Sequence, residues 1–183
     1  MPLSPLLRCF SFRGRRPVSV LVLIGLSALS VSIQAFALTL TKEQHYQSGE
    51  LKANLGRYGS AIEDFTRAIA EDKVYLDAYL ARASAYHKEG LDDKAVFDYN
   101  KAIFIDANNF TAYKGRADSY ATLGVFDNAI KDYTKALELK PQEGALYNKR
   151  GLAYANKKLY PEAIIDFTRA ISFDPSTAEY NFN

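Results

Sequence analysis

A step of 34 residues repeats along most of this chain. It joins four alanines, the aspartates three residues further on, and the aromatic residue directly after each aspartate. These residues are Ala61, Ala95, Ala129 and Ala163; Asp64, Asp98, Asp132 and Asp166; and Phe65, Tyr99, Tyr133 and Phe167. A period of this length, held at many positions, indicates one supersecondary unit that is copied and stacked. Such a stack offers a long surface rather than a catalytic pocket, so the pattern favours an interaction protein.

Each unit is predicted to contain two helices. With Lys42 as position 1, repeating residues occupy positions 4, 8 and 11 and then positions 20, 24 and 27, and each trio lies on one face of a helix. Gly56, Gly90 and Gly124, all at position 15, favour a left-handed residue that ends the first helix. Asp92 and Asp127 are the predicted N-caps of the following helices. The fold class is therefore predicted to be all-α.

The repeat resembles the tetratricopeptide repeat in the placing of its aromatic residues, its small residues and its closing proline. Unit three carries the full pattern: Tyr113, Ala117, Tyr120, Ala129, Tyr133, Ala136 and Pro141. Four units follow without insertion at residues 42–75, 76–109, 110–143 and 144–177, with a short tail at 178–183. The chain departs from the family where Arg fills position 7 in three units, and where Lys73 and Ala107 replace the closing proline. The resemblance implies a right-handed α-solenoid whose first helices line a concave groove for an extended or helical peptide.

Residues 1–37 do not follow the repeat and are predicted to be a secretory signal peptide. Four arginines precede a 16-residue apolar run at residues 18–33, and Ala35-Phe36-Ala37 fits a cleavage site. An uncleaved membrane anchor is the alternative, although the run is shorter than the roughly 20 residues of a spanning helix. A twin-arginine signal at Arg15-Arg16 and an organelle transit sequence also stay open. The protein is expected to be exported, periplasmic or secreted, with membrane anchoring as the second choice.

Cleavage after Ala37 changes the charge of the chain. It removes four of the 23 basic residues and none of the 21 acidic ones, which leaves a net charge of −2. The remaining chain, residues 38–183, is predicted to be one repeat domain, and its charge gives no reason to expect nucleic acid as a partner. Cleavage also removes Cys9, the only cysteine, so no disulfide or thiolate metal site is expected.

Residues suited to catalysis are scarce in this sequence. His45 occupies position 4, where the other units have Tyr, so it is interpreted as a packing residue, and His87 has no second histidine beside it. Neither a zinc-protease motif, nor a phosphate-binding glycine loop, nor a serine elbow occurs. The sequence therefore predicts no enzyme activity, no metal site and no cofactor.

The family resemblance assigns the groove to positions 2, 5, 9 and 12 of each first helix. The predicted groove residues are Glu43, Tyr46, Glu50, Asp77, Leu80, Ser84, His87, Thr111, Lys114, Asp118, Asn148 and Leu152, with Ala53, Ala121, Ala145 and Ala155 beside them. Four are acids and one is a lysine, so a basic or neutral peptide is expected as partner. Family members that bind chaperone tails carry Lys and Asn at positions 5 and 9 of one repeat, where unit one has Tyr46 and Glu50. The asparagine ladder of O-linked N-acetylglucosamine transferase, at position 6, has no counterpart either.

The two ends of the array differ in sequence. Unit one has polar substitutions, Lys52 and His45, at positions where other units carry Tyr. The second helix of unit four keeps the apolar pattern of an interior unit, with Ile164, Phe167 and Ile171. Because solenoids need polar caps, these three residues are predicted to form an end interface, most simply with a second copy in a homodimer. The alternative is that the tail folds back, with Tyr180 and Phe182 covering the patch.

Arginine at position 7 suggests ion pairs between units. Arg occurs there in units two, three and four, whereas unit one, which has no preceding unit, has Ser48. Arg82, Arg116 and Arg150 are therefore predicted to pair with the position-23 aspartate of the unit before, namely Asp64, Asp98 and Asp132. Pairing with the aspartate of the same unit is the alternative.

The leading functional hypothesis is an exported, non-enzymatic scaffold that binds a peptide or protein segment in its groove. The first rival is a self-assembling structural module that uses the repeat ends. The second rival is a regulatory arm of an enzyme carried on another chain.

Overall fold

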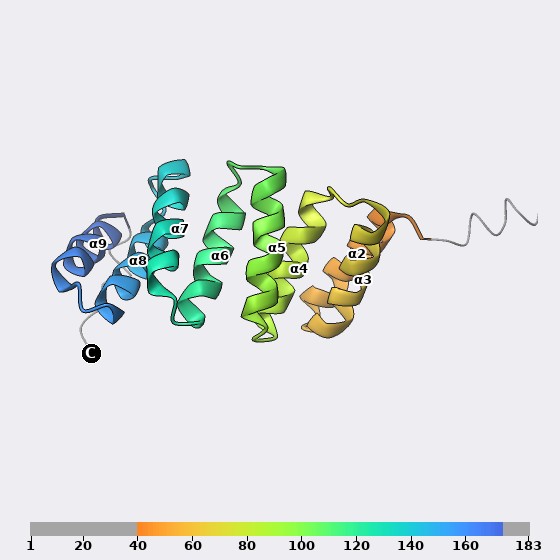
Figure 1. The fold of residues 1–183 in the computed structure, drawn as a ribbon, viewed down its shortest axis with the longest axis horizontal. Coiled ribbons are helices and arrows are strands. Elements are labelled where there is room, and N and C mark those ends of the chain that lie inside the picture. Colours follow the sequence, from red (N-terminus) through yellow and green to blue (C-terminus); the bar gives the residue numbers. More distant parts are fainter. Residues whose placement is uncertain (1–39, 174–183) are drawn as a thin grey trace, which may run out of the picture. The chain divides into compact units, whose positions relative to one another are not determined.

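The computed structural model of the protein describes residues 40–173 and shows eight helices and no strand in that range (Figure 1). The helices are α2 (Lys42–Asn54), α3 (Tyr58–Glu71), α4 (Leu76–Lys88), α5 (Asp92–Ile105), α6 (Phe110–Thr122), α7 (Phe126–Leu139), α8 (Gly144–Asn156) and α9 (Tyr160–Phe173). The first helices begin at the residues that open the four sequence units. The prediction of an all-α solenoid of helix–turn–helix units is confirmed.

The turn inside each unit follows from its backbone hydrogen bonds. Gly56, Gly90 and Gly124 have φ between 72° and 74°, the left-handed conformation predicted for position 15. In each turn the N–H of the position-15 glycine donates a hydrogen bond to the carbonyl oxygen three residues before it. The N–H of the following residue donates to the carbonyl oxygen five residues before that residue. This pair of hydrogen bonds is the Schellman motif, which ends a helix by satisfying its last carbonyl groups.

Unit four makes the same turn without a glycine. Lys158 occupies position 15 with φ of 63°, and its N–H still bonds to the carbonyl of Ala155. A side chain with a Cβ is strained in this conformation. Lys158→Gly should therefore raise the free energy of unfolding by about 1 kcal/mol. Gly124→Lys, the reciprocal change in unit three, should lower it by a similar amount, and urea denaturation measures both. A loss of stability in Lys158→Gly would contradict this reading of the turn.

The prediction that Asp92 and Asp127 cap the second helices is wrong. The N-caps of α5 and α7 are Leu91 and Val125, and neither makes a side-chain capping bond. Because the turn closes within two residues of the glycine, both aspartates fall inside the first turn of the helix. Their charges remain close to the helix N-terminus, where a negative charge is favourable.

Small residues bring the two helices of a unit together. The alanines at position 20 of every unit are buried, as are those at position 27, and the position-24 aromatics Phe65, Tyr99 and Tyr133 lie between the helices with them. Each second helix also packs on the first helix of the next unit, as α3 does on α4 and α7 on α8. The core therefore runs through the units and their junctions, as in other solenoids.

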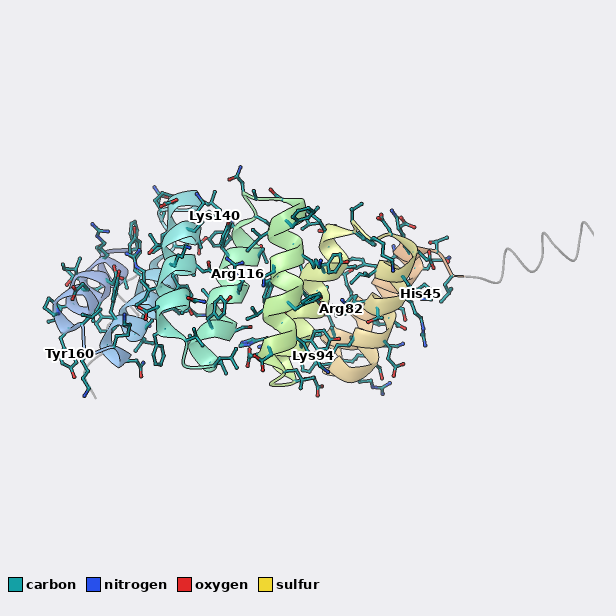
Figure 2. All side chains as sticks on the ribbon, viewed as in Figure 1. His45, Arg82, Lys94, Arg116, Lys140 and Tyr160 are labelled. Atoms are coloured by element: carbon teal, nitrogen blue, oxygen red, sulfur yellow. The ribbon has the colours of Figure 1, made fainter. Side chains whose placement is uncertain are left out.

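The predicted direction of the arginine ion pairs is wrong. Arg82 donates through Nε and Nη2 to both carboxylate oxygens of Asp98, in its own unit, at 2.7 and 2.9 Å. Arg116 and Arg150 pair in the same way with Asp132 and Asp166. Figure 2 labels Arg82 and Arg116.

The junction between units is nevertheless linked by these arginines. The third nitrogen of each guanidinium, Nη1, donates to position 25 of the preceding unit. The acceptors are Thr66 for Arg82, Asn100 for Arg116 and Thr134 for Arg150. Each arginine therefore bonds an aspartate within its unit and a polar side chain in the unit before.

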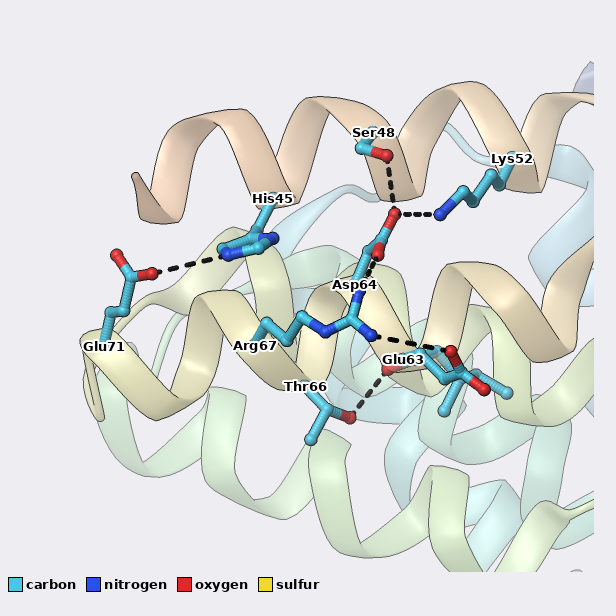
Figure 3. Close-up of polar contacts among 9 residues, drawn as sticks. His45, Ser48, Lys52, Glu63, Asp64, Thr66, Arg67 and Glu71 are labelled. Carbon is cyan, nitrogen blue, oxygen red and sulfur yellow. Dashed lines mark hydrogen bonds and ion pairs between the residues drawn. The ribbon is translucent and has the colours of Figure 1, made fainter. Parts of the chain in front are cut away.

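Unit one has Ser48 at position 7, and three side chains together bind its position-23 aspartate (Figure 3). Ser48 Oγ and Lys52 Nζ both donate to Asp64 Oδ2 at 2.6 Å, and Arg67 Nη1 donates to Asp64 Oδ1 at 2.9 Å. Burial by itself would raise the pKa of Asp64, but the hydrogen bonds from Lys52 and Ser48 and the nearby positive charges lower it below its ordinary value. This cluster therefore stabilises the fold above the ordinary carboxyl pKa, and that contribution is lost as the pH falls through the lowered pKa.

No helix within residues 40–173 is long and apolar enough to cross a membrane. No group of metal-binding side chains occurs in the same range. The predicted signal peptide at residues 1–37, its alternatives, and the tail residues Tyr180 and Phe182 lie outside the described residues.

Candidate peptide-binding groove

Two adjoining hollows, of about 280 and 340 Å³, open along the first helices of units two to four. They share His87, Asp118 and Lys149 in their walls, so they form one surface, which we call the central groove. Its floor includes Tyr99 and Tyr133, the position-24 aromatics of α5 and α7. The regular spacing of the units thus places polar first-helix side chains above a buried aromatic floor.

Seven of the predicted groove residues lie in the walls of the central groove: Leu80, Ser84, His87, Thr111, Lys114, Asp118 and Leu152. Glu50 lines a separate hollow between units one and two, which it shares with Ser84. Glu43, Tyr46, Asp77 and Asn148 line none of these three hollows. Tyr46 is instead half-buried between units one and two, with its ring close to those of Phe65 and Tyr75 and its hydroxyl bonded to Glu50.

Asp118 is bound to neighbouring side chains within the groove. Lys149 Nζ donates to both of its oxygens at 2.8 and 2.7 Å, and Tyr133 Oη donates to Oδ1 at 2.7 Å. Burial, the charge of Asp118 and this hydrogen bond raise the pKa of Tyr133, so its hydroxyl remains a donor. Asp118 therefore serves mainly to link α6, α7 and α8, and its negative charge is balanced before any partner binds.

The charge of the groove varies along the array. The acids Glu43 and Asp77 belong to α2 and α4, in the N-terminal half of the array. Lys88, Lys114 and Lys149 line the central groove, and Lys114 forms no ion pair with any residue in 40–173. The net acidic groove expected from positions 2, 5, 9 and 12 is thus restricted to unit one, because Lys88 offsets Asp77 in unit two and Lys114 and Lys149 line the groove in units three and four.

His87 lies at the meeting point of the two hollows. Its Nδ1 is 2.5 Å from Asp92 Oδ1 and 3.5 Å from Ser119 Oγ. Both partners approach the same ring nitrogen, whereas a Ser–His–Asp catalytic relay places serine and aspartate on opposite nitrogens. The contacts thus orient the imidazole ring and hold α4, α5 and α6 together, and they do not form a hydrolase triad.

The predicted end-interface residues lie on α9. Ile164 is 64% exposed, although the corresponding Ile62, Val96 and Ile130 are half-buried by the unit that follows them. Phe167 and Ile171 are half-buried. Together with Thr168, these residues of α9 form what we call the C-terminal face.

The chain belongs to the tetratricopeptide repeat family, whose profile matches residues 46–110 and 114–178. Proteins of this class are protein–protein interaction scaffolds. No curated protein matches the chain in sequence.

Solved structures show the same fold. A crystal structure of MamA protein matches with a TM-score of 0.70 at 27% identity, over 78% of this chain and 78% of that one. The first tetratricopeptide domain of Spaghetti (RPAP3), bound to the HSP90 peptide SRMEEVD, matches with a TM-score of 0.62 at 25% identity, over 63% of this chain and 91% of that one. A thermophilic tetratricopeptide protein of Thermus thermophilus, TTC0263, matches in fold at 20% identity and a TM-score of 0.63, over 74% of this chain and 75% of that one.

Proposed function

We propose that this protein is a non-enzymatic scaffold that binds a peptide or protein segment in the central groove. The observation that carries the proposal is the pair of hollows along α4, α6 and α8, which share three lining residues. Peptide binding by the Spaghetti (RPAP3) domain supports this use of the fold. Polar groups in the walls and aromatic rings in the floor are the combination that ligand sites use for orientation and affinity.

The charges of the groove define the peptide further. Acids predominate at the groove positions of unit one, where Glu43 and Glu50 lie, and Lys88 and Lys114 in the central groove have no carboxylate partner within residues 40–173. A segment with basic residues at one end and acidic residues at the other would meet opposite charges along its whole length. We therefore propose a peptide of mixed charge that lies along the array, with its basic end on unit one.

This proposal is tested with labelled peptides of about ten residues whose charges are arranged as basic–acidic, all basic or all acidic. The basic–acidic peptide should bind best. Lys114→Glu should weaken its binding about tenfold, because it replaces an attraction with a repulsion at the surface of the groove. Lys131→Glu is the matched control, since Lys131 is exposed on the second helix α7 and lies outside the central groove. Equal losses in the two variants would place binding elsewhere.

We also propose that the protein is exported and cleaved after Ala37. The proposal is supported by the arginines, the short apolar run and the small residues at the cleavage site. N-terminal sequencing of the exported protein should find Leu38 as the first residue. Recovery of the intact Met1 start from membranes would instead favour an anchor at residues 18–33. A homodimer through the C-terminal unit is the alternative use of Ile164, Phe167 and Ile171, and light scattering on the full chain tests it.

A further inference from the structure

The C-terminal face repeats a surface that is already occupied elsewhere in the chain. Positions 21, 25 and 28 of a second helix face the next unit: Thr66 accepts a bond from Arg82, and Ile69 packs in one core cluster with Ala78. The same residue types occupy these positions in units one and four: Ile62, Thr66 and Ile69, and Ile164, Thr168 and Ile171. The surface of α3 that receives α4 is thus reproduced on α9.

The helix that occupies this surface in unit one has a defined pattern. Ala78 and Ala85, at positions 3 and 10 of α4, are buried and let the helices approach closely. Arg82, at position 7 between them, donates to Thr66 Oγ1 at 2.9 Å. The same combination of a small residue at position 10 and Arg at position 7 recurs in α6 and α8, each packed on the second helix before it.

We propose that the C-terminal face binds an α-helix of a partner protein with this pattern, namely small residues at positions 3 and 10 and an arginine at position 7. The arginine would donate to Thr168 Oγ1, and the small residues would lie against Ile164 and Ile171. The argument rests on continuity, because the face extends a series of three junctions that share a small residue at position 10 and an arginine bond to position 25. Position 3 is small in α4 and α6, whereas α8 has Leu146 there. It does not depend on the function proposed for the groove.

A second copy of the chain does not offer a helix of this kind. Among the described residues, α4, α6 and α8 each already pack on the unit before them, and only the first helix α2 has no preceding unit. This helix has Leu51 at position 10 and Ser48 at position 7. Positions equivalent to Leu51 are buried Ala or Ser in units two to four, so a leucine there would overpack the junction. If the C-terminal faces of two copies packed on each other, Thr168 would have no arginine as its partner, because the face contains none.

The test uses a lactam-bridged, fluorescent peptide with the sequence of α4, Leu76–Lys88, and the full chain. Ile164→Glu should weaken binding of this peptide about tenfold or more, since a charge would enter an apolar contact. Ile165→Glu is the matched control, because Ile165 is 56% exposed on the same helix but at position 22, which is exposed in every unit. The affinity of the α4 peptide for this control should stay within about twofold of its affinity for the unsubstituted chain.

A double-mutant cycle tests the arginine bond. Thr168→Val should weaken binding of the α4 peptide but leave binding of a peptide with Ala in place of Arg82 unchanged, because only the first peptide offers the guanidinium. Equal effects on both peptides would overturn the proposal. So would a dimer seen by light scattering and abolished by Ile164→Glu, which would assign the face to a second copy. Binding that appears only after deletion of residues 174–183 would assign it to the chain's own tail.

Discussion

Arg82→Met is expected to lower the free energy of unfolding by about 3–5 kcal/mol. The guanidinium of Arg82 is the bidentate partner of Asp98, whose side chain is 1% exposed. Methionine removes the positive charge while keeping an apolar side chain of similar length, so Asp98 would be left as an uncompensated buried charge. The same change also removes the bond to Thr66 that links units one and two.

Two comparisons separate the ion pair from general damage to the core. Arg67→Ala should cost only about 0–1 kcal/mol, because Arg67 is 57% exposed and Asp64 keeps Ser48 and Lys52 as donors. The double variant Arg82→Met with Asp98→Leu should recover most of the loss, since no buried charge then remains. Urea denaturation measures all three. A loss below about 1 kcal/mol in Arg82→Met would show that water solvates Asp98 in the fold.

Gly115→Ala is expected to lower the free energy of unfolding by about 1–3 kcal/mol. A Cβ at Gly115 would lie 2.3 Å from Tyr99 Cζ and 2.4 Å from its Oη. Tyr99 is buried between units two and three, so its ring can move away only into the hollow whose floor it forms. The higher helix propensity of alanine offsets at most about 1 kcal/mol of this strain.

Gly59→Ala is the matched control for this prediction. Gly59 also lies within a helix, α3, but a Cβ there would meet no atom within 4 Å. The substitution should therefore stabilise the chain by up to about 1 kcal/mol through helix propensity alone. If both variants gained stability in thermal denaturation, the close approach of Tyr99 to α6 would be contradicted.

The period of the sequence was enough to predict the fold because every level of structure repeats with it. The steps between Gly56, Gly90 and Gly124 marked the turns, and the helices begin where the units do. The period could not decide the direction of the arginine pairs. Asp98 follows Arg82 by 16 residues and Asp64 precedes it by 18, so both aspartates are equally regular in sequence. Only the packing of the two helices within a unit brings Asp98 into reach.

The groove was predicted less completely than the fold. The positions taken from the family identified Ser84, His87 and Leu152, which lie in the walls of the central groove. They left out Lys88 and Lys149, which stand one position beyond the chosen ones and still reach the groove because lysine side chains are long. A search of positions 6 and 13 would have found both. The balancing of Asp118 by Lys149 and Tyr133 joins three helices and was not visible from spacing alone.

Site-specific photo-crosslinking tests the groove most directly. A benzoylphenylalanine is placed at Leu152, in the wall of the central groove, or at Phe104, which is 90% exposed on the second helix α5 and lines no part of that groove. Both variants are expressed in the native cell and irradiated. A scaffold that binds its partner in the central groove should form a crosslinked complex from position 152 and none from position 104. Crosslinks from position 104 with none from position 152 would contradict the account.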